Sequence, residues 1–203
     1  VLTVKDVEEK TRGVIINFAC HPVTMGGKSF NLISSDFPGV ATDLIEKVKG
    51  DETVAMFFNG AYADTHPRKD LVPGYNYHSQ IKGDELTTTL GTILGAAALK
   101  ISETTYAHSN ITIQAHSETI RVPLVKLPSE EELRDRIPKD RQGLEELMKG
   151  EAPRREWWWL KISLDWYEYL LELYGKGKQF RTYEDLEIQV IRVGGIYLVG
   201  LPG

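Results

Sequence analysis

The 203-residue sequence predicts an α/β fold: a mixed β-sheet with flanking helices and a helical insertion. Two observations carry this prediction. Short apolar runs alternate with polar loops and helical segments up to about residue 100, and a charged, aromatic stretch at 127–180 then separates strand-like segments. We expect residues 1–203 to form a single fragment of an α/β domain, incomplete at both ends, with 127–180 as a helical insertion within it.

The first half of the chain has a strand–loop–helix rhythm. Residues 13–20 and 53–58 are short apolar runs that stop at polar, glycine-containing loops, as buried strands do. Helices are expected at about 38–49 and 83–100, the first with Asp36 as a candidate N-cap. The second helix carries small residues that permit close backbone packing: Gly91, Gly95, Ala96, Ala97 and Ala98.

The second half begins and ends with strands. Residues 110–125 alternate in polarity, which predicts a strand with one buried face. Strands at about 186–193 and 196–201 flank Gly194-Gly195, a pair typical of a hairpin turn.

The stretch between these strands is helical in pattern. Ser129 and Glu132 form a capping-box pair at its start. We expect one face of the following aromatic helix to pack on the domain core, or on a part of the protein outside these residues, in preference to a lipid surface. The residues at helical spacing are Trp157, Leu160, Leu164, Tyr167, Leu171 and Tyr174.

Composition narrows the class of partner. The formal charge is −5 and the pI about 5.6, which argues against nucleic acid as the main partner. No apolar run reaches the ~18 residues of a transmembrane helix. The single cysteine, Cys20, excludes an intrachain disulfide, and the composition is compatible with a homo-oligomer as well as a monomer.

Four polar side chains follow the first two strands. His21 and His66 each precede a proline, which restricts their backbone to extended conformations, and Asp36 and Asp64 lie in the same two loops. Sites in α/β sheets collect beyond the carboxyl ends of strands. Histidine and carboxylate together make either a metal site or an acid–base pair. The alternative is that these are ordinary loop residues and that Asp36 only caps a helix.

Three stretches resemble the catalytic domain of the neutral/alkaline, non-lysosomal ceramidases. They are NFACHPVTMGGKSFNLISSDFPGVATDLIEK, AMFFNGAYADTHPR and the closing YLVGLPG. The first resembles the family's strand ending in a His-Pro motif, and the second resembles the strand ending in Gly-Asp-x-Ser-Pro-Asn. The third is similar to the strand before the family's Pro-Gly-Glu.

The resemblance implies a zinc-dependent amide hydrolase that acts on N-acylsphingosine or another small-molecule or lipid amide. It implies that His21 is a zinc ligand. The family's remaining ligands, a second His, a Glu and a Tyr, have no match in this chain. We therefore expect weak zinc binding by these 203 residues, with His21 as the only strong ligand.

One departure from the family bears on the chemistry. The Gly-Asp-x-Ser-Pro-Asn motif reads Ala63–Arg68 here, so that His66 replaces the family's serine. His66 could act as a base, bind metal or mark a changed substrate. With it, Asp64 is expected to be catalytic, and Asp36 to orient ligands or the loop backbone. The alternative function is a non-catalytic binding domain that retains the fold and has lost the catalytic residues.

Overall fold

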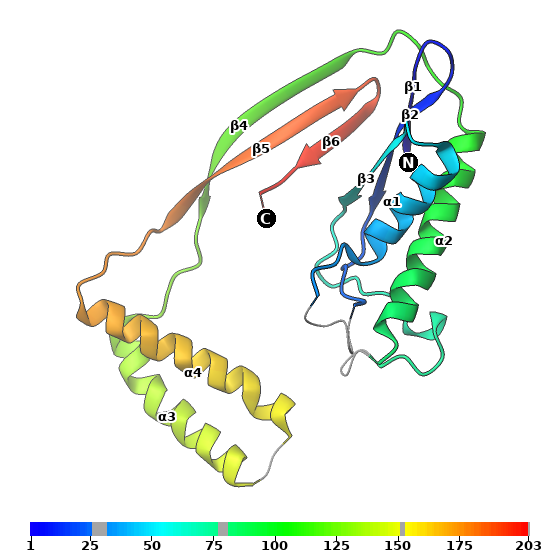
Figure 1. Cartoon of the computed structure of the whole chain (residues 1–203). Helices are drawn as coiled ribbons and strands as arrows, with labels where there is room; N and C mark the ends of the chain where they lie inside the picture. The colour runs from blue at the N-terminus through cyan, green and yellow to red at the C-terminus, as the bar shows by residue number, and fades with distance from the viewer. Residues whose placement is uncertain (26–31, 77–80, 151–152, 203) are drawn as a thin grey trace. The chain divides into compact units, whose positions relative to one another are not determined.

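The computed structural model describes residues 1–25, 32–76, 81–150 and 153–202. The chain divides into two compact units, Val1–Asn110 and Ile111–Gly203, and each contains a three-stranded sheet and helices (Figure 1). The predicted mixed α/β class is confirmed. The expectation that the whole chain is a fragment of one domain is not tested by this division and remains a prediction.

The sheet of the first unit is mixed. It contains β1 (Leu2–Lys5), β2 (Thr11–Phe18) and β3 (Val54–Asn59) in that order. β1 runs antiparallel to β2, whereas β2 and β3 are parallel. The two strands expected from the apolar runs are therefore confirmed as neighbours, and each is displaced by only one or two residues from its predicted range.

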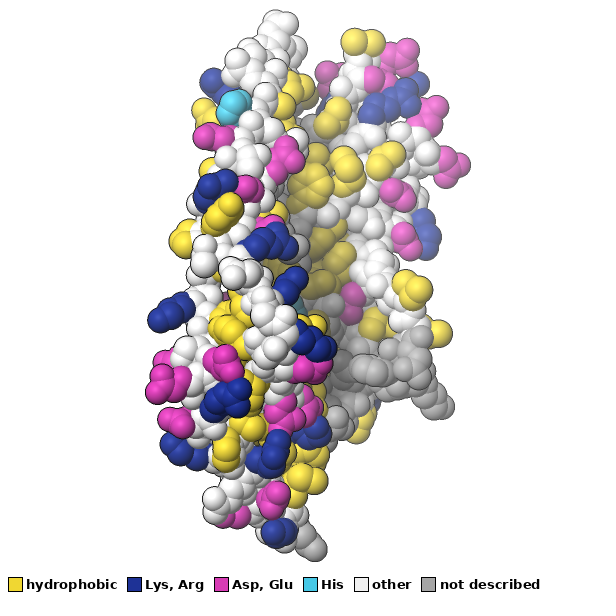
Figure 2. Space-filling view, turned by 90° about the vertical axis from the view of Figure 1, so that its left-hand side faces the viewer, with side chains coloured by type: hydrophobic (Ala, Val, Ile, Leu, Met, Phe, Trp, Pro, Cys, Tyr) yellow, Lys and Arg dark blue, Asp and Glu magenta, His cyan; other side chains and the backbone are white. Residues whose placement is uncertain are grey.

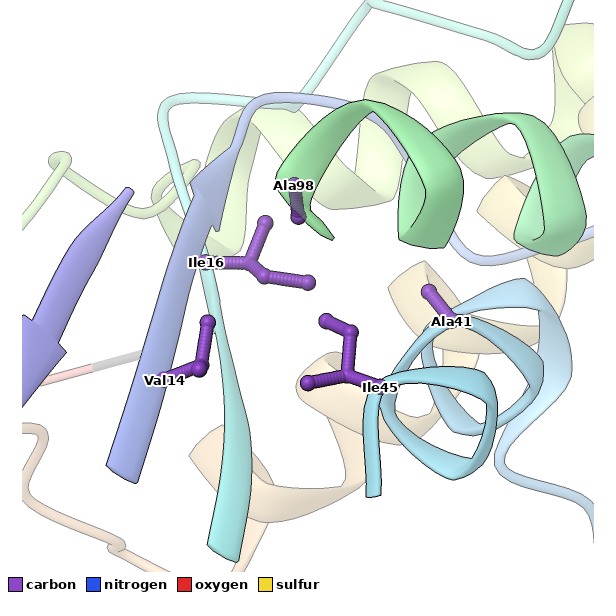
Figure 3. Packing of buried hydrophobic residues seen from close by; sticks show 5 residues of the cluster. All are labelled: Val14, Ile16, Ala41, Ile45 and Ala98. Carbon is purple, nitrogen blue, oxygen red and sulfur yellow. The ribbon is translucent and has the colours of Figure 1, made fainter. Parts of the chain in front are cut away.

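Two helices cover one face of this sheet. Parallel strands need a crossover connection, and α1 (Asp36–Lys49) lies in the connection between β2 and β3. α2 (Gly83–Thr104) packs beside α1 (Figure 1). Apolar side chains from β2, α1 and α2 meet in a buried cluster (Figure 3): Val14, Ile16, Ala41, Ile45 and Ala98.

Glycine permits the close approach of α1 and α2. A Cβ on Gly91 would lie 2.4 Å from the Val40 Cβ and 2.8 Å from the Phe37 carbonyl oxygen. A Cβ on Gly95 would lie 2.9 Å from the Ala41 carbonyl oxygen. Since backbone atoms cannot move aside as a flexible side chain can, the predicted role of these two small residues is confirmed.

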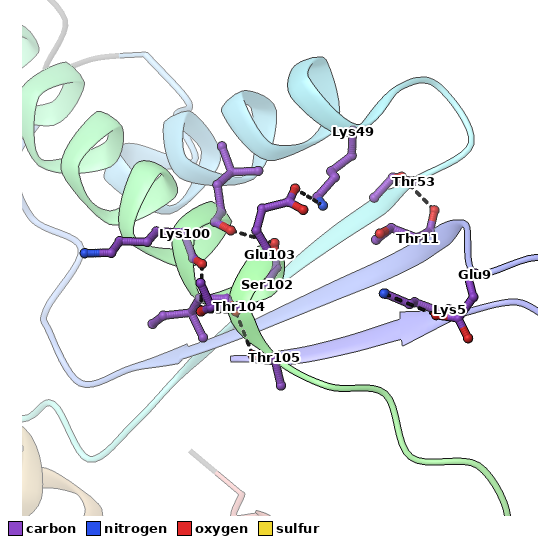
Figure 4. A network of polar contacts seen from close by, with 12 residues as sticks. Lys5, Glu9, Thr11, Lys49, Thr53, Lys100, Ser102, Glu103, Thr104 and Thr105 are labelled. Carbon is purple, nitrogen blue, oxygen red and sulfur yellow. Dashed lines mark hydrogen bonds and ion pairs between the residues drawn. The ribbon is translucent and has the colours of Figure 1, made fainter.

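Polar contacts join the far ends of these helices and strands (Figure 4). Lys49 Nζ donates to Glu103 Oε1 at 2.5 Å, linking the last turn of α1 to that of α2. Thr53 Oγ1 donates to the Thr11 carbonyl oxygen at 2.9 Å, just before β3 pairs with β2. Exposed ion pairs of this kind contribute ~1 kcal/mol or less, so the apolar cluster dominates the stability of this unit.

The sheet of the second unit is antiparallel. It contains β4 (Ile113–Pro123), β5 (Tyr183–Val193) and β6 (Ile196–Gly200), and Gly194 turns the β5–β6 hairpin with φ of 59°. The prediction that the first of these strands buries one face is wrong. Every residue of β4 except Val122 is exposed, because the described helices of this unit pack mainly on each other.

Those helices form a hairpin between β4 and β5. α3 (Glu130–Lys149) and α4 (Arg154–Gly175) lie inside the range 127–180 where a helical insertion was expected. The capping box is confirmed, since Ser129 Oγ accepts from the Glu132 N–H and the Ser129 N–H donates to the Glu132 carboxylate.

The aromatic residues of α4 divide between two faces. The predicted packing face is confirmed, since all six of its residues belong to the cluster around Leu133, Ile137 and Leu144 of α3. Trp158, Trp159 and Trp166 lie outside that cluster and are exposed.

Two alanine substitutions should have opposite effects on stability. Gly91→Ala should cost about 1–3 kcal/mol, the usual cost of overpacking, because its Cβ meets backbone. Gly143→Ala in α3 should add about 0.5–1 kcal/mol, because its Cβ meets only Leu160 at 3.8 Å and alanine favours the helix.

The two units can be followed separately in urea. Hydrogen exchange of β2 amides reports the first unit, and tryptophan fluorescence reports the second, since all four tryptophans lie in α4. A Gly91→Ala variant as stable as the wild type would contradict the helix contact described above.

Candidate functional site

The candidate site is built on the carboxyl ends of β2 and β3. Because these strands are parallel and paired in register, their following loops leave from the same edge of the sheet. The His21 N–H donates to the Thr65 carbonyl oxygen at 2.8 Å, so the two loops are hydrogen-bonded to each other. This bond restrains the backbone at His21 and at Thr65, the residue before His66.

The structure brings His21 and His66 together, as the strand-end argument predicts. Their ring centroids lie 5.6 Å apart with an interplanar angle of 75°. The Tyr62 ring lies against His21, with centroids 4.9 Å apart and an angle of 32°. His21 is half-buried and its Nδ1 is buried with no hydrogen-bond partner among the described residues, whereas His66 is exposed.

Asp36 does not occupy the N-cap position for which it was a candidate. It is the first residue of α1, with φ of 53°, and Ser35 occupies the N-cap position. Its buried carboxylate accepts at 2.8 Å from the backbone N–H groups of Thr24, Met25 and Phe37. The prediction that Asp36 caps the helix is therefore wrong, and its carboxylate instead holds the backbone that follows His21.

Two threonines extend this network to α2. Thr24 Oγ1 donates to Asp36 Oδ1 at 2.5 Å and lies 2.6 Å from Thr87 Oγ1. Because Thr24 gives its single hydroxyl hydrogen to the carboxylate, Thr87 is the donor between the two threonines, and its Oγ1 also lies 2.8 Å from the Gly83 carbonyl oxygen. Sequence reasoning missed both threonines. The available signal was Thr87 itself, a polar residue beside Leu86 on the buried face of a helix.

Asp64 and Arg68 lie in the loop after β3 and are exposed. Arg68 forms an ion pair with Asp70, and this pairing raises the pKa of Arg68 and lowers that of Asp70. The Arg68 guanidinium is thus paired with Asp70 of its own loop.

Cys20, the residue before His21, is buried. Burial, and then the negative charge of Asp36, raise the pKa of its thiol. Within the described ranges, no group of three or more His, Cys, Asp or Glu side chains is arranged to hold a metal ion. Of the ligating side chains described there, His21 and His66 are a pair whose rings lie in contact distance of each other.

Charged side chains of both signs lie on the surface of the described residues. Lysine and arginine side chains are interspersed with aspartate and glutamate on the face seen in Figure 2, with no broad basic area there. Of the helices described, none is long and apolar enough to cross a membrane.

The fold is similar to that of a known hydrolase. No family model and no curated protein matches the sequence. The structure is similar to the crystal structure of neutral ceramidase from Pseudomonas aeruginosa, with a TM-score of 0.60 and 19% sequence identity over 98% of this chain. The similarity shows a ceramidase-like fold. The chain spans about a third of the length of that protein, 33%.

Replacing Asp36 by asparagine should destabilise the first unit by at least about 2 kcal/mol. Each carboxylate oxygen accepts a backbone N–H, so either orientation of the amide sets its NH₂ against a buried donor. Asparagine tolerates positive φ as aspartate does, so the backbone is not strained.

The matched control is Asp43→Asn on the exposed side of the same helix, which should change stability by less than ~0.5 kcal/mol. Urea unfolding followed by hydrogen exchange of α1 amides measures both variants. Equal stability of the two variants would show that the Asp36 contacts carry no net energy.

Proposed function

We propose that the chain forms part of a ceramidase-like, zinc-dependent amide hydrolase. The observation that carries the proposal is the pair of imidazoles, with ring centroids 5.6 Å apart, in the loops that follow adjacent parallel strands of a ceramidase-like fold. His21 is the proposed metal ligand. His66 and Asp64 are the proposed catalytic residues, and Asp36 orients the loop that carries His21.

The surroundings of His21 fit a metal ligand. A buried imidazole nitrogen normally has a hydrogen-bond partner, and the Nδ1 of His21 has none among the described residues. A nitrogen with a free lone pair is what a metal ion needs. When bound, zinc would polarise an amide carbonyl as a Lewis acid.

The other residues position this imidazole and face the substrate. Tyr62 stacks on the His21 ring, and the bond from the His21 N–H to Thr65 fixes its backbone. Asp36 restrains residues 24 and 25 through their N–H groups. His66 and Asp64 are exposed, so both can reach a bound substrate or a water molecule.

The proposed substrate is a lipid amide such as N-acylsphingosine, or another small-molecule amide. Support for an N-acylsphingosine comes from the neutral ceramidase whose fold this chain resembles. His66 stands where that family has its serine, and this replacement favours the second candidate, a binding domain that has lost the chemistry. Hydrolysis by the complete natural protein separates the two candidates.

In the complete protein, His21→Ala should lower amide hydrolysis on the order of 10²-fold or more, because the metal loses a ligand that orients it. Activity should also disappear on chelation and return with zinc. Release of fatty acid from N-acylsphingosine and from a short N-acyl amine measures the rate.

His108→Ala is the control, since His108 is exposed and lies beyond the end of α2. It should leave the rate unchanged within about twofold. A folded wild-type protein that hydrolyses neither amide, with or without zinc, would refute the hydrolase and support the binding domain.

A further inference from the structure

We propose that His66 is a second ligand, so that His21 and His66 together bind one divalent metal ion. The inference rests on the proposed function for the choice of zinc, and it changes the role of His66 there. It is carried by the placement of the two rings and by the unpartnered nitrogen of His21.

The spacing of the rings fits two ligands of one ion. Zinc lies ~2.1 Å from a ligating imidazole nitrogen, so two rings at a tetrahedral angle have centroids roughly 5 Å apart. The observed separation is 5.6 Å. The ring torsion of histidine is broad, so small rotations of the two rings can adjust this separation without moving the backbone.

The backbone beneath the rings is held from both loops. The hydrogen bond from His21 to Thr65 joins the residue bearing one ring to the residue preceding the other. Each histidine also precedes a proline, and Pro67 is buried. Because a hydrogen bond and two prolines restrain this backbone, binding costs less conformational entropy than it would between two unrestrained loops.

Two imidazole ligands favour a metal ion of intermediate hardness. Imidazole favours Zn²⁺, Cu²⁺, Ni²⁺ and related ions, whereas Mg²⁺ and Ca²⁺ prefer oxygen ligands. The described residues add no third His, Cys, Asp or Glu to the pair. Two ligands leave two positions of a tetrahedral ion open, one more than in the usual catalytic zinc site with its three protein ligands.

A ligand and a base at position 66 differ in a measurable way. Loss of either would lower hydrolysis, so the rate alone cannot distinguish them. Only a ligand contributes to metal affinity. The decisive measurement is therefore zinc binding.

Zinc affinity should be measured by competition with a chromogenic chelator on the full 203-residue chain. His21→Ala and His66→Ala should each weaken binding roughly tenfold or more, because each leaves a single imidazole. His108→Ala should leave it unchanged. Zinc should also shift the imidazole ¹⁵N resonances of both His21 and His66 in the wild type, a readout that needs no variant to fold.

The outcomes separate this inference from the proposed function. Zinc affinity that survives His66→Ala but not His21→Ala, with no shift at His66, would overturn the two-histidine site and leave His66 as a base. Loss of zinc affinity in both variants supports the site even where the complete protein hydrolyses no amide. In that case only the proposed reaction fails.

Discussion

The parallel pairing of β2 and β3 is the constraint on which the candidate site depends. Parallel strands end at the same edge, so the residues that follow them become neighbours although more than 40 residues separate them in sequence. The crossover that this pairing requires contains α1, which supplies Asp36. One topological choice therefore brings His21, His66 and Asp36 to one end of the sheet.

The helices stabilise the site through packing as well as through hydrogen bonds. A side chain on Gly91 would separate α1 from α2 at the Phe37 carbonyl, next to Asp36. The same approach allows Thr87 of α2 to reach Thr24, which in turn contacts Asp36. Close helix packing and the buried polar network are thus coupled, and a change in either should disturb the loop of His21.

Much of this arrangement follows from local sequence patterns. The strand runs, the capping box and the packed face of α4 depend on residues near one another in sequence, and they were predicted correctly. The role of Asp36 depends on a positive φ and on Thr24 and Thr87, which no local pattern reveals. The exposure of β4 was missed because alternation marks a face that can be buried without identifying what would cover it.

The proposed correspondence of His66 with the family's serine illustrates why a ceramidase-like fold does not fix the chemistry. The buried Pro67 and the hydrogen bond from His21 to Thr65 restrain the backbone on either side of position 66. A serine hydroxyl at such a position is a candidate nucleophile, whereas an imidazole binds metal far better. On the proposed assignment, the fold is unchanged and only the role of position 66 differs: a serine there would attack the substrate, whereas His66 binds the metal ion. Function therefore depends on the site more than on the fold that carries it.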